Sequence, residues 1–210
     1  TAAYTLEPSG SANGECSVNI PNSTIVVPAG TYKLTIKGSG DDTNVTGDLD
    51  IRGEVSIQGA SASTTIIDAT GLGERVIDIW DSASTTLSNL TITGGQSFET
   101  GVLVPAGGIL NDGDLTIVDS VIKGNTGLDG GGIWNRGPNL DPGTITISGS
   151  LINANSATRN GGGVFNFAPG SMTIDNSTIS GNFAVAGSGG GIVQDSANGT
   201  VTINNSTIAN

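Results

Sequence analysis

Residues 161–166 read Gly161-Gly162-Gly163-Val164-Phe165-Asn166, and Met172-Thr173-Ile174-Asp175-Asn176-Ser177-Thr178-Ile179-Ser180-Gly181-Asn182 follows shortly after. This stretch decides the fold because its parts recur through the chain. Its apolar–Thr–apolar triplet is found as Leu115-Thr116-Ile117, Ile145-Thr146-Ile147, Met172-Thr173-Ile174 and Val201-Thr202-Ile203, at intervals of 27 to 30 residues. A period of this size indicates a solenoid.

The content of the repeat indicates which kind of solenoid. Each unit holds an apolar–Thr–apolar triplet, a second short apolar segment and a glycine cluster before another apolar residue, which is typical of short strands separated by turns. Glycine and asparagine suit corners that need positive φ. The sequence therefore predicts an all-β fold, a single right-handed parallel β-helix of about seven coils with three short strands per coil. Leucine-rich and propeller repeats fit this content less well.

One uninterrupted pattern predicts one continuous domain. We expect residues 1–50 to form an N-terminal cap and the first coils, with longer loops, and residues 51–210 to form the regular coils. In such a stack each coil contacts only its neighbours, so stability is approximately a sum of local terms.

The composition excludes several classes of partner. The net charge is −12 with no histidine, which argues against nucleic acid and anionic membrane surfaces. No apolar run is long enough for a membrane span, so we expect no membrane insertion. The single cysteine, Cys16, has no internal disulfide partner. Because the chain begins with Thr1 rather than methionine, we expect a mature or trimmed product that is exported.

Four strings near the N-terminus carry a resemblance to a known family. They are Tyr4-Thr5-Leu6 before Cys16-Ser17, then Val27-Pro28-Ala29-Gly30-Thr31-Tyr32, then Thr46-Gly47-Asp48-Leu49-Asp50-Ile51. In this order they resemble bacterial surface proteins with a parallel β-helix and an N-terminal module named for Cys-Ser-Leu-Arg-Glu-Ala. The chain departs from that family at Val18-Asn19-Ile20-Pro21. The later Gly-Gly-x-Ile repeats are more loosely similar to polymorphic outer-membrane proteins. The resemblance implies a surface location and assigns no activity.

Asparagines recur once per coil and predict structural ladders along the stack. The first row follows the second apolar segment of each unit and comprises Asn125, Asn155, Asn182 and Asn210. A second row follows the Gly-Gly-apolar step, comprises Asn111, Asn135 and Asn166, and is broken at Gln194. Stacked amides of this kind satisfy turn backbone and each other. Such a row is also able to bind a sugar, which is the alternative interpretation.

A candidate calcium site lies in the acidic segment before the regular coils. Oxygen-bearing side chains alternate there, at Asp42, Asn44, Asp48 and Asp50, and would share one face of an extended segment. Calcium prefers six to eight oxygen ligands. The alternative is a hydrated acidic loop in which Asp48 and Asp50 bond the neighbouring turn. No other cofactor is predicted.

The rival functional class is a polysaccharide-binding or pectin-lyase-like polysaccharide-cleaving β-helix. Hydrolysis needs two carboxylates at a defined separation. Asp78 with Asp112, and Asp112 with Asp141, are imaginable pairs on adjacent coils, but no basic residue completes a recognisable motif. Aromatic residues are candidate platforms for surface glycans: Trp80, Trp134, Phe165 and Phe167. Because Trp134 and Phe165 share a repeat position that continues to Val193, we also expect an apolar stack there.

The ends of the rod are the predicted assembly surfaces. Thr207 and Ile208 lie in a partial last coil, which leaves strand edges for a further coil from a longer surface protein or for a second copy stacked end to end. An N-terminal strand comprising Ala3, Tyr4, Thr5 and Leu6 is a candidate for addition to a neighbour. We therefore predict a non-enzymatic structural protein, secreted or on the bacterial cell surface, that acts as a fibre subunit, stalk or adhesin.

Overall fold

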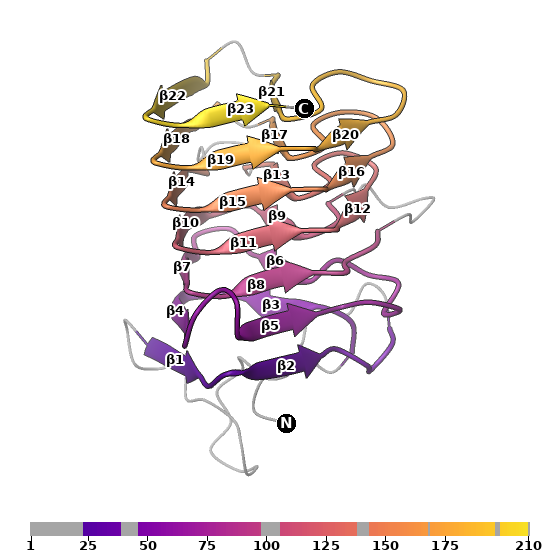
Figure 1. Cartoon of the computed structure of the whole chain (residues 1–210), viewed down its shortest axis with the longest axis vertical. Coiled ribbons are helices and arrows are strands. Elements are labelled where there is room, and N and C mark those ends of the chain that lie inside the picture. Colours follow the sequence, from indigo (N-terminus) through magenta and orange to yellow (C-terminus); the bar gives the residue numbers. More distant parts are fainter. Residues whose placement is uncertain are drawn as a thin grey trace.

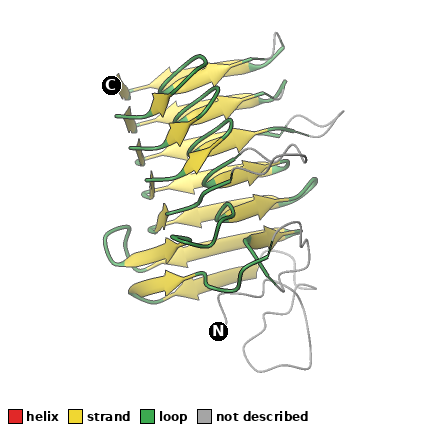
Figure 2. Cartoon of the chain, turned by 90° about the vertical axis from the view of Figure 1, so that its right-hand side faces the viewer, coloured by secondary structure: helices red, strands yellow, loops and turns green. Residues whose placement is uncertain are grey.

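The computed structural model describes residues 23–38, 46–97, 106–137, 143–167, 169–195 and 198–209. These residues form strands, turns and loops without a helix, and the strands pair in parallel from one coil to the next (Figure 1). The predicted fold class, an all-β parallel β-helix, is confirmed. Viewed from a second side, the coils lie one above the next (Figure 2).

Three sheets run the length of the stack. Sheet A contains β1 (Ser23–Val27), β4 (Glu54–Gly59), β7 (Ser84–Ser88), β10 (Asp114–Val118), β14 (Ile145–Ser148), β18 (Ser171–Asp175) and β22 (Thr200–Asn204). Sheet B contains β2 (Gly30–Lys33), β5 (Thr65–Asp68), β8 (Thr91–Thr93), β11 (Val121–Lys123), β15 (Leu151–Asn153), β19 (Thr178–Ser180) and β23 (Thr207–Ala209). Sheet C contains β3 (Leu49–Ile51), β6 (Ile77–Ile79), β9 (Ile109–Asn111), β13 (Ile133–Asn135), β17 (Val164–Asn166) and β21 (Ile192–Gln194).

The repeated triplets lie in register in sheet A. Ile117 is opposite Ile147, Ile147 is opposite Ile174, and Ile174 is opposite Ile203. The threonine at the centre of each triplet alternates with these residues and therefore faces outward. The sequence period thus becomes one step of the stack.

Two details differ from the prediction. From β4 to β21 the stack makes about five regular coils, slightly fewer than the predicted seven, because β1, β2 and β3 belong to a first coil that is described only in part, and β22 and β23 only begin another. A fourth sheet, sheet D, is also present and contains β12 (Thr126–Gly127), β16 (Ser156–Ala157) and β20 (Phe183–Ala184). These two-residue strands carry no alternating apolar pattern, so the sequence did not reveal them.

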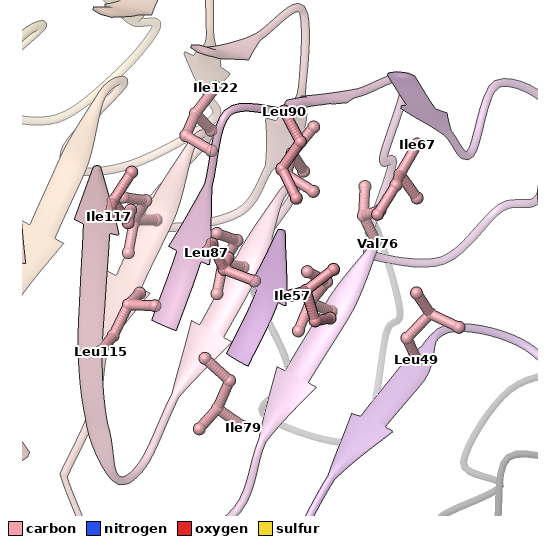
Figure 3. Close-up of a cluster of buried hydrophobic side chains, with 14 of the residues drawn as sticks. Leu49, Ile57, Ile67, Val76, Ile79, Leu87, Leu90, Leu115, Ile117 and Ile122 are labelled. Atoms are coloured by element: carbon pink, nitrogen blue, oxygen red, sulfur yellow. The ribbon is translucent and has the colours of Figure 1, made fainter. Parts of the chain in front are cut away.

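The core is a column of aliphatic side chains enclosed by sheets A, B and C. Figure 3 shows Ile57, Leu87 and Ile117 from successive strands of sheet A lying beside Ile79, Leu90 and Ile122. Each of these side chains is almost completely buried. Burial of one such side chain contributes about 1.5–3 kcal/mol, so the stack is stabilised by many similar increments rather than one central cluster.

The glycine cluster of each later coil makes room for sheet D. A Cβ atom on Gly131 would lie 2.3 Å from the Ser156 carbonyl oxygen in β16, and one on Gly162 would lie 2.4 Å from the Phe183 carbonyl oxygen in β20. Both neighbours are backbone atoms that cannot move aside cheaply. Glycine is therefore required where sheet D passes the start of sheet C.

The described residues include no helix that could cross a membrane.

Candidate functional site on the outer face of sheet C

The central residue of each sheet C strand faces away from the core and forms one column along the stack. In order from β3 to β21 this column comprises Asp50, Asp78, Leu110, Trp134, Phe165 and Val193. The column is acidic in the first two strands and apolar in the last four. We call the first part the acid–arginine cluster, which comprises Asp48, Asp50, Glu74, Arg75, Asp78, Asp112 and Arg136, and the second part the apolar stripe, which comprises Leu110, Trp134, Phe165 and Val193.

Arg75 is the centre of the acid–arginine cluster. Its guanidinium forms an ion pair with Asp48, and its Nη2 atom lies 3.6 Å from Glu74 Oε1 and 3.5 Å from Asp78 Oδ2. All four residues are buried, and Arg75 itself is only 5% exposed. Ions removed from water to this extent need partners, because desolvation of an unpaired charge is costly. The cluster is therefore an interdependent unit.

Burial shifts the ionisation of this cluster. Desolvation raises the pKa of Asp78 to about 7, helped by the charges of Asp48, Asp50 and Asp112 and opposed by Arg75. Burial acts to lower the pKa of Arg75, but the neighbouring carboxylates outweigh it, and the net pKa is raised. The cluster thus contains a permanent cation and one carboxyl that exchanges its proton near neutral pH.

A second arginine, Arg136, joins the cluster from the position directly after β13. The Arg136 guanidinium donates two hydrogen bonds to the Asp112 carboxylate, one of them from Nε to Oδ1 at 2.8 Å. This hydrogen bonding raises the pKa of Arg136. Asp112 also lines a hollow of about 220 Å³ at the corner between sheets C and A, together with Asp81 and Asp114. An acid-lined hollow therefore lies beside a half-exposed arginine.

Aromatic rings continue the surface beyond the charges. Trp134 and Phe165 are stacked with ring centroids 6.4 Å apart, and Phe167, which is half exposed, lies 5.9 Å from Phe165. The predicted apolar stack of Trp134, Phe165 and Val193 is therefore present. Near the other end of sheet C, the Arg52 guanidinium lies 3.9 Å from the centre of the Trp80 ring. Of the predicted glycan platforms, the structure shows Phe167 exposed and Trp134 and Phe165 buried.

Two of the four candidate calcium residues lie in the described part of the chain. Asp42 and Asn44 lie outside the described residues, whereas Asp48 and Asp50 are buried rather than hydrated. Asp48 pairs with Arg75, and Asp50 Oδ1 accepts a hydrogen bond from Trp80 Nε1 at 3.3 Å. Within the described ranges no group of three or more acidic, histidine or cysteine side chains is arranged to hold a metal ion. Calcium binding stays a prediction.

The first asparagine row forms a continuous ladder in the described coils. Asn155 Oδ1 accepts hydrogen bonds from the backbone N–H and the side-chain amide of Asn125, each at 3.0 Å, and Asn182 Oδ1 does the same for Asn155. All three residues are buried. Asn210, the fourth predicted member, lies outside the described residues.

Two further ladders run parallel to the first. Asn111, Asn135, Asn166 and Gln194 are linked through their side-chain amides, so Gln194 continues the second row that the sequence suggested was broken there. A serine ladder at the corner between sheets A and B, which the sequence analysis missed, comprises Ser120, Ser150, Ser177 and Ser206. Its members do recur with the period of the repeat.

The predicted assembly residues lie at opposite ends of the chain. Ala3, Tyr4, Thr5 and Leu6 lie outside the described residues. Thr207 and Ile208 lie in β23, the last strand of sheet B, and both are exposed. Ile208 stands above the buried Ile179 in the same column, so its exposure marks an uncovered cross-section of the core.

Glu74 and Arg75 are the site residues that the sequence analysis did not identify. They occupy the step where later coils carry glycines, because Val76 precedes Ile77 just as Gly108 precedes Ile109 and Gly132 precedes Ile133. The sequence did hold a signal for this site, because two charged residues stand where later repeats carry their glycine cluster.

Comparison with known proteins adds no family. No protein-family model, no curated protein and no solved structure matches the chain.

Proposed function

We propose that this protein is a non-enzymatic structural rod, secreted or displayed on a bacterial cell surface as a fibre subunit, stalk or adhesin. The observation that carries the proposal is the stack of coils joined by three polar ladders. Every ladder bond links one coil to the next, so bending the rod or separating its coils breaks buried hydrogen bonds. The resemblance to bacterial surface proteins with a Cys-Ser-Leu-Arg-Glu-Ala module agrees with this location.

The side wall also supports a structural role. Arginines on it are engaged with carboxylates: Arg75 with Asp48, Arg136 with Asp112, and Arg159 with Asp129. Asp78 and Asp112, the pair that would have to reach a substrate, are both buried. Buried charges that are engaged with one another favour a fixed arrangement of side chains rather than groups offered to solvent.

Polysaccharide binding or cleavage is the second candidate. The specific observation in its favour is that Asp78, with a pKa of about 7, and Asp112 belong to one cluster beside an acid-lined hollow. A carboxyl with a raised pKa is suited to general acid catalysis, and a perturbed pKa is frequent at functional sites.

A turnover assay separates the two candidates. Pure protein is incubated with polygalacturonate and alginate, with and without calcium, and both new reducing ends and unsaturated products are measured. The structural proposal predicts no product above the level of the matched variant Asp112→Asn. Turnover that is lost in Asp112→Asn, while the variant keeps its folded circular dichroism spectrum, would overturn the proposal and establish the enzyme.

A further inference from the structure

The corner between sheets A and B keeps one residue type from coil to coil, except in two adjacent coils. The residue directly after a sheet A strand turns this corner with a positive φ, and in chain order these residues are Asn89, Asp119, Gly149, Asn176 and Asn205. Asparagine is one of the few residues other than glycine that adopt this conformation readily. Asparagine is therefore the ordinary residue at this corner, and Asp119 and Gly149 are departures from it.

The neighbouring column of sheet B departs from the repeat in the same two coils. The first residues of the strands from β8 to β23 lie in register and are Thr91, Val121, Leu151, Thr178 and Thr207. Aliphatic side chains replace threonine only in β11 and β15, the strands that follow Asp119 and Gly149. The flanking coils form the same corner with threonine and asparagine, so the backbone does not require these four substitutions.

The four substituted residues line one open groove of about 420 Å³, which we call the corner groove. Its other lining residues are Ala62, Ser120, Ser150, Asn176 and Thr178. Val121 and Leu151 are half-buried and lie about one strand spacing, roughly 4.8 Å, apart, so they give the groove an apolar floor. The loop at Ala62 lies next to it and is held by a hydrogen bond from Thr91 Oγ1 to the Ala62 carbonyl oxygen at 2.6 Å.

The Asp119 carboxylate is the single charged group among the residues that line the corner groove. A Cβ atom on Gly149 would lie 2.3 Å from Asp119 Oδ1, so the carboxylate extends across the glycine towards the next coil. Within the described ranges this carboxylate has neither a hydrogen-bond donor nor an ion-pair partner. Lys123, two residues beyond Val121 on the same face of β11, does not pair with it.

An apolar floor beside an unpaired carboxylate complements an aliphatic chain that ends in a cation. A lysine side chain has this form, because its stem packs on apolar surface while its compact ammonium group reaches a polar partner. The planar guanidinium of arginine is better suited to bidentate pairing. The net charge of −12 also attracts basic segments from a distance.

We propose that the corner groove binds a lysine side chain of a partner polypeptide, with the stem against Val121 and Leu151 and the ammonium group on Asp119. This site gives the side wall of the rod a partner, which goes beyond the structural role proposed above. The partner presents the lysine on an exposed segment, since the groove is open to solvent.

A peptide titration of the full chain tests the proposal. The probe is a capped alanine peptide with one central lysine, added up to millimolar concentration to isotope-labelled protein while backbone amide resonances are followed. A matched peptide carries norleucine in place of lysine, which keeps the stem and removes the charge. The variants are Asp119→Asn and Leu151→Thr, each of which installs the residue that flanking coils carry. Glu54→Gln is the control, because it removes one exposed charge from the outer face of sheet A.

The lysine peptide is expected to shift the amide resonances of Val121, Gly149 and Leu151. Both groove variants should weaken its binding about fivefold, which corresponds to about 1 kcal/mol, and Glu54→Gln should leave it unchanged. Asp119→Asn decides the matter alone if the spectrum of Leu151→Thr shows an unfolded chain.

Several results would overturn the proposal. These are no shifts at millimolar peptide, shifts confined to other parts of the chain, equal binding of the norleucine peptide, or an equal loss in Glu54→Gln, which would indicate attraction to the net charge alone. Free cadaverine that binds as tightly as the peptide would also overturn it, because the occupant would then be a small amine. None of these results bears on the turnover assay, so the structural role is judged separately.

Discussion

The early and late coils of this molecule place polar and apolar residues on opposite faces of sheet C. In β3 and β6 the last residue of the strand is Ile51 or Ile79 in the core, and the central residue is Asp50 or Asp78 on the outer face. From β13 onward the corresponding core-side residues are asparagine or glutamine, whereas the outer residues are aromatic or aliphatic. The change takes place at β9, within one step of the stack.

This inversion shows that the backbone of the coil is compatible with two ways of burying polar groups. The early coils bury charges on the outside of sheet C and pair Asp48 and Asp78 with Arg75. The late coils bury neutral amides inside the corners and satisfy them through the ladders. Charges must be paired within a local cluster, whereas amides propagate indefinitely from coil to coil. Only the late arrangement can therefore be extended by repetition.

The largest expected effect comes from breaking the early arrangement. Arg75→Met leaves three buried carboxylates without their cation, and it should lower the free energy of unfolding by about 3–5 kcal/mol. Arg159→Met is the matched control, because the Arg159 side chain is 48% exposed and its pair with Asp129 should contribute less than about 1 kcal/mol. Urea denaturation measures both. Equal losses in the two variants would contradict the central role of Arg75.

A pH series sharpens the same comparison. The pKa of Asp78 is about 7 in the folded chain against 3.8 in the unfolded chain, so the folded state binds more protons between these values. The free energy of unfolding should therefore fall as the pH rises from about 4 to about 7, by up to about 4 kcal/mol for this group at about 1.4 kcal/mol per pKa unit. Asp78→Asn should flatten this decline. An unchanged pH profile would place the titration elsewhere.

The late coils should be sensitive to added volume at the glycine step. Gly131→Ala places a methyl group against the backbone of β16, and it should destabilise the chain by about 3 kcal/mol through overpacking. Gly53→Ala is the control, since a Cβ atom there meets nothing within 4 Å. The two melting temperatures give the comparison. A tolerated alanine at Gly131 would show that sheet D does not require the glycine.

A smaller effect is expected from removing one rung of a ladder. Asn155→Ala deprives Asn125 of its acceptor and Ile122 of its donor, and it should cost about 2 kcal/mol. Asn153→Ala, two residues earlier on the outward side of β15, should be close to neutral. Urea midpoints of the two variants decide the point, because similar midpoints would mean that the ladder adds little to the stack.

The period of the sequence was enough to predict the fold and part of the site. The triplets predicted in-register strands, and the recurrence of Asn125, Asn155 and Asn182 predicted that they stack. The stacking of Trp134 on Phe165 was predicted because the two residues occupy the same repeat position. These features share a cause, since equal spacing along the chain places residues in one column of a parallel stack.

The rest of the site lacks that periodicity. Arg75 pairs with Asp48, 27 residues earlier in the chain, and with Asp78, 3 residues later, and no repeat position links all three. The burial of Asp48 and Asp50 follows from these contacts and not from their local sequence, which resembles a hydrated loop. Sheet D could not be predicted from the sequence, because its strands are two residues long and β12 and β16 carry small or polar residues.

The central claim is that side-chain oxygen atoms of each late coil accept hydrogen bonds from the coil before it. Hydrogen exchange of the corner amides tests this claim most directly. The N–H groups of Ser120, Ser150, Asn125 and Asn155 donate to ladder side chains. The account predicts that they exchange as slowly as the strand amides of Ile117 and Ile147, through global unfolding only. Exchange at the rate of exposed loop amides would contradict it.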